Sequence, residues 1–372
     1  MSIHVKKVTN RRDLRRWIDL PYRMYRDEPN FVPQLRREQR AFFDARRNPS
    51  FDTAAVQFFL AERDGVVVGR VCGIVNSLET EKLGRKRGRF GWFESVNDEA
   101  VAKALLDAVR TWLDEQQCVE MTGPHGFTDL DVEGLLIEGF DVVPTISGAY
   151  NFPYYQALLE GYGLVKDVDY FDSMAVVPDR LPLFERLRER FRNSGYEVRT
   201  CATSKELKTH LPALWDLLEE SFEPLYGVVP LTPAQRDFYT EAYFDFLDPE
   251  FVVLVFKPGA GLVGFMIGMP SLSRAFQRAR GRLYPFGFIH ILRAFRKPRV
   301  VDFLLAGAKP GESSSTRASL GLIAMFDTLR RRGVKFVETN HELEDNVTVH
   351  NIWTKLEQLE IRRSRIYRMD LV

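Results

Sequence analysis

"GAKPGESSSTRASLGLIAMF", residues 307–326, is the segment that decides the fold. A Gly/Pro turn leads to three serines and a threonine at 313–316, and apolar residues at helical spacing follow. The apolar "RVVDFLLAGA" at 299–308 precedes it and is typical of a buried strand. Strand, loop and helix start are the elements that bind phosphate through free backbone amides. The usual Gly-x-Gly is missing, so a serine-capped helix start without a ligand is the alternative.

The two halves of the chain share one order of predicted elements. In the first half, a hairpin at 57–75 and a strand at 89–96 precede a helix that Asn97 should cap. In the second half, a hairpin at 251–269 precedes the strand and helix of the opening segment. This repetition predicts an α/β fold with an internal duplication, in which each copy is a central mixed β-sheet flanked by helices.

Length and composition fit two domains of ordinary size. The 372 residues suffice for two hydrophobic cores, and we place the boundary near residue 180, giving domains 1–180 and 181–372. A net charge of +1 argues against a nucleic-acid partner. Three widely spaced cysteines and scattered histidines predict no disulfide framework and no metal site. The longest apolar runs are strand-sized, so we expect a cytoplasmic protein that is able to touch the inner face of the membrane.

The second half resembles the GNAT superfamily of acyl-CoA-dependent N-acyltransferases. The resemblance rests on the order strand, phosphate-type loop, helix and strand, followed by "EDN" at 344–346. In that family an Arg/Gln-x-x-Gly-x-Gly/Ala loop wraps the CoA pyrophosphate, and an Asn that opens the next helix lies near the pantetheine. Here Asn346 matches that Asn, while Trp353 stands where many members carry an acid-acting Tyr.

Longer phrases narrow the resemblance. "WIDLPYRMYRDEPNFVPQL" (17–35), "YNFPYY" (150–155), "PFGFIHILRAFRKP" (285–298) and "LEDN" (343–346) resemble a bacterial group of tandem GNAT-like proteins, the bacterial ceramide synthases. The resemblance implies two tandem GNAT-like domains that transfer an acyl group from acyl-CoA, or from an acyl-carrier protein, to the amine of a lipid such as a sphingoid base. It implies no metal.

The two halves differ at the helix that should receive the donor. In the first half, Asp98 and Glu99 occupy the helix start and would repel a pyrophosphate. In the second half, no acid follows Glu312 until Asp327, so we expect the donor there. The residues expected to contact it are Leu305, Ala306, Gly307, Ala308, Ser313, Ser314, Ser315, Thr316, Arg317, Ala318, Asn346 and Trp353.

The segment 271–299 carries seven arginines, one lysine and no acid. It predicts a basic amphipathic element suited to an anionic membrane surface or a lipid substrate. Two alternatives are contact with the 3′-phosphate of CoA, and a covered sheet face whose arginines pair with acids elsewhere. The residues that carry this prediction are Phe286, Phe288, Phe295, Arg293, Arg296 and Lys297.

N-acylation requires a base for the amine and a stabilised oxyanion. The candidates are Glu338, His341, Glu344 and Asn346, with the alternative that Glu344 only caps the last helix. Tyr154 and Tyr155 of the first half would close the cleft, or else only pack. Two other functions stay open: a catalytically degenerate lipid- or CoA-binding module, and an aminoacyl transferase of the peptidoglycan type, which the near-neutral charge disfavours.

Overall fold

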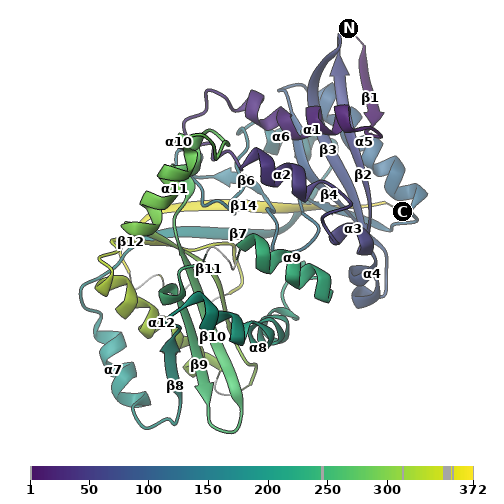
Figure 1. Ribbon diagram of the computed structural model, residues 1–372. Helices are drawn as coiled ribbons and strands as arrows, with labels where there is room; N and C mark the ends of the chain where they lie inside the picture. The colour runs from purple at the N-terminus through teal and green to yellow at the C-terminus, as the bar shows by residue number, and fades with distance from the viewer. Residues whose placement is uncertain (1, 244–246, 312–313, 347–352, 354–355, 372) are drawn as a thin grey trace.

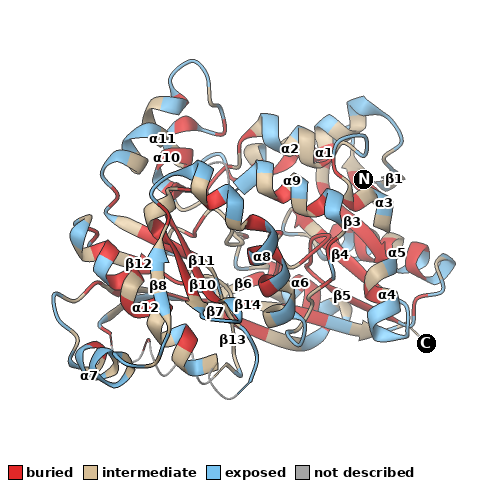
Figure 2. Cartoon of the chain, turned by 60° about the horizontal axis from the view of Figure 1, so that its bottom comes forward, coloured by how far each residue is buried: buried red, intermediate tan, exposed pale blue. Residues whose placement is uncertain are grey.

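The fold was obtained as a computed structural model that describes residues 2–243, 247–311, 314–346, 353 and 356–371. One continuous sheet of fourteen strands runs through the molecule, with helices on its faces (Figure 1). Most buried residues lie along this sheet and on the helix sides that face it (Figure 2). The α/β fold class is therefore as predicted.

The first half supplies seven strands and six helices to the described part. Its strands are β1 (Ile3–Lys7), β2 (Ala54–Arg63), β3 (Val66–Asn76), β4 (Arg87–Ser95), β5 (Glu120–Gly123), β6 (Leu135–Glu138) and β7 (Val165–Val176). Its helices are α1 (Arg11–Met24), α2 (Arg36–Phe42), α3 (Ser50–Thr53), α4 (Ser77–Leu83), α5 (Glu99–Glu115) and α6 (Tyr155–Tyr162).

The second half repeats the plan with a helical insertion. Its strands are β8 (Glu197–Thr200), β9 (Val252–Lys257), β10 (Gly261–Pro270), β11 (Val300–Ala308), β12 (Phe336–Glu338), β13 (Glu342–Leu343) and β14 (Gln358–Asp370). Its helices are α7 (Pro182–Phe191), α8 (Ser204–Phe222), α9 (Pro233–Tyr243), the 3₁₀ turn η2 (Pro249–Phe251), α10 (Ser273–Ala279), α11 (Gly287–Arg296) and α12 (Ser314–Arg331).

The two halves exchange strands at the middle of the sheet. The order is β1-β2-β3-β4-β5-β14-β7-β12-β11-β10-β9-β8, so β14 pairs with β5 of the first half and β7 pairs with β12 of the second. The parallel pairs β4–β5 and β11–β12 occupy matching places in the two halves. The sequence indicated the duplication but not this exchange, because the order of strands in a sheet depends on contacts far apart in the chain.

The predicted elements agree with the structure apart from their ends and the insertion. Asp98, not Asn97, caps α5: its side chain accepts hydrogen bonds from the backbone N–H groups of Ala100 and Val101. The segment 271–299 forms the two helices α10 and α11, and α1, α2 and α9 were not predicted. The expected helix after Asn346 lies mostly outside the described residues. Residue 180, the proposed boundary, lies between β7 and α7.

Glycines in β3 let α5 pack closely on the sheet. A Cβ atom added at Gly73 would lie 2.7 Å from Cε3 of Trp112, a buried side chain of α5. Gly161, by contrast, is a helical glycine of α6 with open space around it. We expect Gly73→Ala to lower the free energy of unfolding by about 1–3 kcal/mol, and Gly161→Ala to raise it by about 0.5–1 kcal/mol. Urea unfolding of both variants checks this; equal effects would contradict the packing.

Candidate active site

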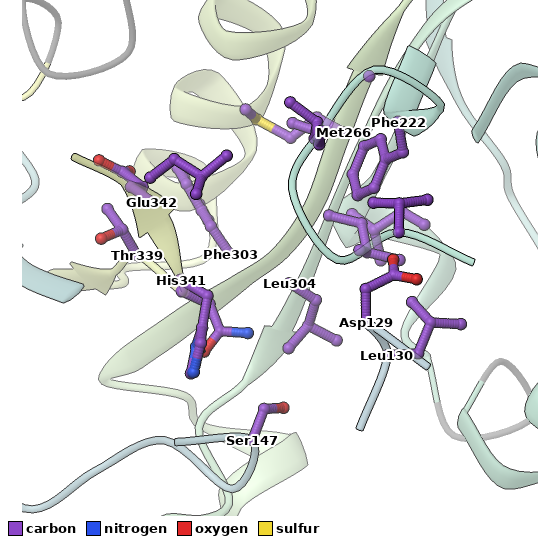
Figure 3. A pocket seen from close by; sticks show the side chains of 18 of the residues that line it. Asp129, Leu130, Ser147, Phe222, Met266, Phe303, Leu304, Thr339, His341 and Glu342 are labelled. Atoms are coloured by element: carbon purple, nitrogen blue, oxygen red, sulfur yellow. The ribbon is translucent and has the colours of Figure 1, made fainter. Parts of the chain in front are cut away.

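The site lies where two neighbouring strands separate. β11 and β12 pair in parallel from Val300–Phe336 to Asp302–Glu338, and β11 then continues alone on that side to Ala308. A cavity of about 380 Å³ fills the gap between them (Figure 3). Because β12 no longer pairs with this part of β11, backbone N–H groups on that edge are available to a ligand.

Seven of the expected donor contacts and the predicted catalytic residue His341 line this cavity. The separated end of β11 supplies four of them, α12 supplies one, and the segment after β12 supplies three. They are Leu305, Ala306, Gly307, Ala308, Ala318, His341, Asn346 and Trp353. Phe303, Leu304, Phe265, Ile267 and Leu322 add apolar surface, so the lining is suited to an acyl chain or a pantetheine arm.

The start of α12 is open, whereas the matching start of α5 is occupied. Ser314, Ser315 and Thr316 form the first turn of α12, which contains no acid. Arg317 is buried, and its Nη2 donates to the carbonyl oxygens of Lys309 and Pro310, so this arginine fastens the preceding loop. Ser313 lies outside the described residues. At α5 the Asp98 carboxylate already accepts hydrogen bonds from the first backbone N–H groups of the helix and pairs with Arg63. The acidic residues in the sequence at this helix start indicated that it would be occupied.

A loop from the first half closes the opposite wall. Asp129, Leu130, Asp131 and Glu133, between β5 and β6, line the cavity beside Phe222, Leu225 and Tyr239 of the second half. Figure 3 shows Asp129 and Leu130 across the cavity from His341 and Glu342. Burial raises the pKa of Asp129 to about 6, with the neighbouring Glu133 adding to the rise. Sequence reasoning missed this loop, although its run of acids after "GPHGF" (123–127) was a usable signal.

His341 is held in a demanding backbone conformation at the cavity wall. Its φ of 46° lies in the left-handed region, which is uncommon for a residue with a side chain. Nε2 lies 3.2 Å from the Glu133 carbonyl oxygen, and Nδ1 lies 3.2 Å from Asn340 Oδ1 and 3.6 Å from the Asp172 carboxylate. The His341 backbone N–H donates to the same Asp172. Oxygen atoms that can accept hydrogen bonds therefore lie beside both ring nitrogens of His341.

Glu342 and Trp353 form a second polar group on the lining. Burial raises the pKa of Glu342 to about 8, against opposing hydrogen bonds with Trp353 and Thr339. At neutral pH this carboxyl group therefore holds a proton, as an acid must. Trp353 is buried against Phe303, with ring centroids 5.6 Å apart.

Several predicted site residues do not line the cavity: Ser314, Ser315, Thr316 and Arg317 of the expected donor contacts, and Glu338, Glu344, Tyr154 and Tyr155. Glu344 pairs with Lys166 at 2.6 Å and accepts a hydrogen bond from the Asp169 backbone N–H. Both partners belong to β7, so Glu344 holds this strand and does not face the cavity. Glu338 is buried 3.5 Å from Arg362. Tyr155 donates to Glu94 inside the first-half core, and Tyr154 donates to the Ser95 carbonyl. The tyrosines therefore pack, which was the alternative left open for them.

A buried carboxyl pair lies beneath the cavity. Asp302 and Glu338 occupy paired positions on β11 and β12, and Arg362 of β14 is the cation between them and Asp172. Neither Asp302 oxygen accepts a hydrogen bond of normal geometry from the described residues, although the Ser271 hydroxyl is near. Burial raises the pKa of Asp302 to about 7, against the opposing effects of Ser271 and the Arg362 charge.

This pair predicts a pH-dependent stability. A carboxyl whose folded pKa is raised stabilises the fold fully below its unfolded pKa of 3.8, and that contribution is lost as the pH rises through about 7. We therefore expect Asp302→Asn to gain stability relative to the wild type between pH 5 and pH 8, by about 2–3 kcal/mol. Urea unfolding of both proteins at the two pH values measures the difference in their free energies of unfolding. A difference that does not change with pH would contradict the prediction.

The described residues contain one group of three side chains that could together hold a metal ion. Cys201, Glu206 and His210 lie at the start of α8, with ligand atoms within 4.8 Å of one another. Glu206 accepts from the Ala202 backbone N–H while Thr203 accepts from Glu206 N–H, which is a capping arrangement. Burial raises the pKa of the Cys201 thiol, which disfavours the thiolate that a metal needs. None of the three lines the cavity.

The basic side chains of the insertion are exposed. Phe286 is 69% exposed, Phe288 and Arg293 are also exposed, and Phe295 packs against the second-half core. Within the described chain, Arg293, Arg296 and Lys297 form no ion pair. The alternative that these arginines pair with acids on a covered sheet face is therefore wrong.

Comparison with known proteins agrees with this architecture. The chain is 26% identical over 376 residues to Protein YghO of Escherichia coli (strain K12), covering 99% of this chain and 95% of that protein. It is 26% identical over 367 residues to the bacterial ceramide synthase of Caulobacter vibrioides (strain NA1000 / CB15N), covering 96% and 95%. No protein-family model matches.

A solved structure shows the same fold. A tandem GNAT protein from the clavulanic acid biosynthesis pathway superimposes with a TM-score of 0.56 at 13% identity, covering 100% of this chain and 99% of that one. The chain therefore has the tandem GNAT fold, and its resemblance to a bacterial ceramide synthase is confirmed over nearly its whole length. In the described part of the chain, no helix combines the length and hydropathy required to cross a bilayer.

Proposed function

We propose that the protein is an N-acyltransferase that transfers an acyl group from an acyl thioester, acyl-CoA in the first instance, to the amine of a lipid such as a sphingoid base. The cavity between β11 and β12 carries this proposal, because one apolar space meets an open helix start at one wall and acidic side chains at the other. Its similarity to the ceramide synthase of Caulobacter vibrioides supports the choice of a long-chain amine.

The donor would enter along β11. Its thioester would lie in the gap where β12 no longer pairs, with the carbonyl oxygen against backbone N–H groups of β11 that stabilise the oxyanion. Its phosphates would lie at the first turn of α12, where Ser314, Ser315 and Thr316 offer hydroxyls; the Ser314 backbone N–H itself donates to the Gly311 carbonyl oxygen. Hydroxyls then take part of the role that glycine-rich backbone has in the usual loop.

The acceptor would enter from the wall formed by the first half. Asp129 and Glu133 place carboxyl groups where a protonated amine can be held, and Leu130, Phe222 and Leu225 lie beside them for its chain. His341 would take the proton from the nitrogen, and the Asp172 carboxylate behind the ring would stabilise the imidazolium. The nitrogen then attacks the thioester carbon, so a C–N bond forms and the C–S bond breaks.

The leaving thiolate needs a proton. Glu342 lines the same cavity beside Trp353 and holds a proton at neutral pH, so it is the group we assign to protonate the sulfur. The protonated amine loses two protons. The first goes to His341 before the attack, and the second leaves the nitrogen after the C–N bond has formed and passes to the Glu342 carboxylate that protonated the sulfur. Solvent then removes the proton from His341. The products are an amide and a free thiol.

Asp129→Asn is expected to weaken the amine substrate selectively. Loss of one charged contact should raise the KM for the amine by about tenfold, while the KM for the acyl donor stays unchanged. The same loss should occur in the wild type as the pH falls through about 6, because Asp129 then becomes protonated. Steady-state kinetics with each substrate varied in turn checks this. An equal rise in both KM values would remove Asp129 from the acceptor site.

The proposed activity is tested with the purified full-length protein, a long-chain acyl-CoA and a sphingoid base in detergent micelles. We expect mass spectrometry to detect the N-acyl product in step with the appearance of free thiol. Acyl-carrier protein in place of CoA tests the second donor. Donor binding without amide or thiol would instead indicate a catalytically degenerate binding module, and no binding of either donor would exclude the proposal.

A further inference from the structure

The face formed by α1, α10 and α11 is rich in unpaired positive charge. We call it the basic aromatic surface; its cations are Arg11, Arg12, Arg15, Arg26, Arg274, Arg278, Arg280, Arg282, Arg293, Arg296 and Lys297. All of them are exposed, and none forms an ion pair with the residues that the structure describes. These three helices lie along one edge of the molecule, with α2 beside them (Figures 1 and 2).

Large apolar side chains project from the same surface. Tyr284 is 68% exposed, Phe286 is 69% exposed and Leu292 is 51% exposed, and all three belong to the turn before α11 or to α11 itself. Exposing large apolar side chains to water is unfavourable, so several of them together indicate a contact surface. Aromatic rings interleaved with arginines are typical of elements that lie in the headgroup region of a bilayer.

The surface is fixed to the rest of the protein. Gln277 Nε2 donates to the carbonyl oxygens of Pro29 at 2.8 Å and Phe31 at 3.2 Å, which joins α10 to the loop after α1. The Arg36 backbone N–H donates to the Gly281 carbonyl at 3.0 Å. A hollow between the two segments contains Asp27 and Glu28, and the Glu28 carboxylate accepts from Tyr150. Cations from both halves are thus presented together.

The inner side of α11 leads towards the cavity. Ile291, Ala294 and Phe295 pack against the same apolar cluster as Phe265, Ile267 and Leu304, and the last three also line the cavity. An apolar chain taken from a bilayer at this surface would therefore meet apolar side chains along its way inward.

We infer that the basic aromatic surface docks the protein onto an anionic phospholipid membrane. The cations would attract the headgroups, while Tyr284, Phe286 and Leu292 enter the interface. An acidic protein would pair with the cations but would leave these apolar side chains exposed to water. A bilayer accommodates both, so the observations favour a bilayer. That the docked membrane delivers the lipid amine to the cavity rests on the proposed function; the docking itself does not.

The charge requirement is tested by flotation of the full-length protein with vesicles of phosphatidylcholine, with and without phosphatidylglycerol. We expect binding only to the vesicles that contain phosphatidylglycerol, and weaker binding at high salt. The triple variant Arg278→Glu, Arg293→Glu, Arg296→Glu should bind these vesicles about a hundredfold more weakly. A matched control, Arg186→Glu, Arg190→Glu, Lys205→Glu, changes three exposed cations on α7 and α8 by the same charge and should bind like the wild type.

The apolar requirement has its own variant. Tyr284→Ser combined with Phe286→Ser keeps every charge, and the exposure of both rings leaves the core intact. We expect it to lose the part of vesicle binding that survives high salt. Wild-type binding by the charge variant or by the aromatic variant would overturn the proposal. So would a wild type that binds no vesicles but binds an acidic acyl-carrier protein through these arginines.

The outcome can be separated from the proposed activity. Acylation of a sphingoid base in detergent micelles does not require docking, so the charge variant should keep its micellar activity. Micellar activity without vesicle binding in the wild type would disprove the docking and leave the N-acyltransferase standing. Vesicle binding without any amide product would support the docking and exclude the proposed N-acyltransferase activity.

Discussion

Ala318→Trp is expected to abolish acyl transfer by filling the donor side of the cavity. Ala318 lies in the first helical turns of α12, is exposed, and lines the cavity, so an indole ring there would occupy ligand space without disturbing the core. We expect kcat/KM to fall about a hundredfold or more, which corresponds to a loss of about 3 kcal/mol of transition-state binding. Calorimetric titration with CoA should show a matching loss of affinity.

Ala260→Trp is the matched control for this prediction. Ala260 is exposed in the turn between β9 and β10 and does not line the cavity, so the same substitution there should leave donor binding and acyl transfer unchanged. Equal activity of Ala318→Trp and the wild type would show that the donor does not occupy the space between β11 and β12.

His341→Asn is expected to remove the base while preserving the backbone. Asn tolerates the left-handed conformation that His341 adopts, so folding should not suffer. Loss of a general base lowers kcat by about 10²–10⁴-fold. The rate should rise again at high pH, where the amine is deprotonated without help.

The pH profile distinguishes a base from a merely structural residue. A variant that lost activity through misplacement of the loop would be equally slow at every pH. His4→Gln, on β1 at the far edge of the sheet, serves as the control and should keep full activity. Full activity of His341→Asn at neutral pH would assign the base to another side chain, with Asp129 next to be tested.

The fold could be predicted largely from local patterns, and the site only in part. Hairpins, the strand at 299–308 and the helix after it follow from periodicity and turns, so the cavity-lining residues Leu305–Ala308 and Ala318 could be named from the sequence. The exchange of β7 and β14 was not found, because it is decided by pairing between segments that are 190 residues apart, as in Asp172 and Arg362. The loop at 129–133 enters the second-half cavity through that same long-range arrangement.

Individual roles were harder to predict than positions. Glu338 and His341 are three residues apart, yet one is buried beside Arg362 and the other lines the cavity, because the chain leaves the strand at Glu338 and turns at His341. Burial and the nearby Asp172 charge raise the pKa of Glu342, and neither effect is visible in a local sequence pattern. Arg317 resembles a phosphate ligand in the sequence but is used to hold the loop.

The central claim is that the space between β11 and β12 holds the acyl donor. A crystal structure of the full-length protein with a non-hydrolysable acyl-CoA tests it most directly. We predict the acyl chain in the cavity, the thioester carbonyl against the unpaired edge of β11, and the pyrophosphate at Ser314–Thr316. A donor bound instead at the start of α5, or with its chain outside this cavity, would contradict the account.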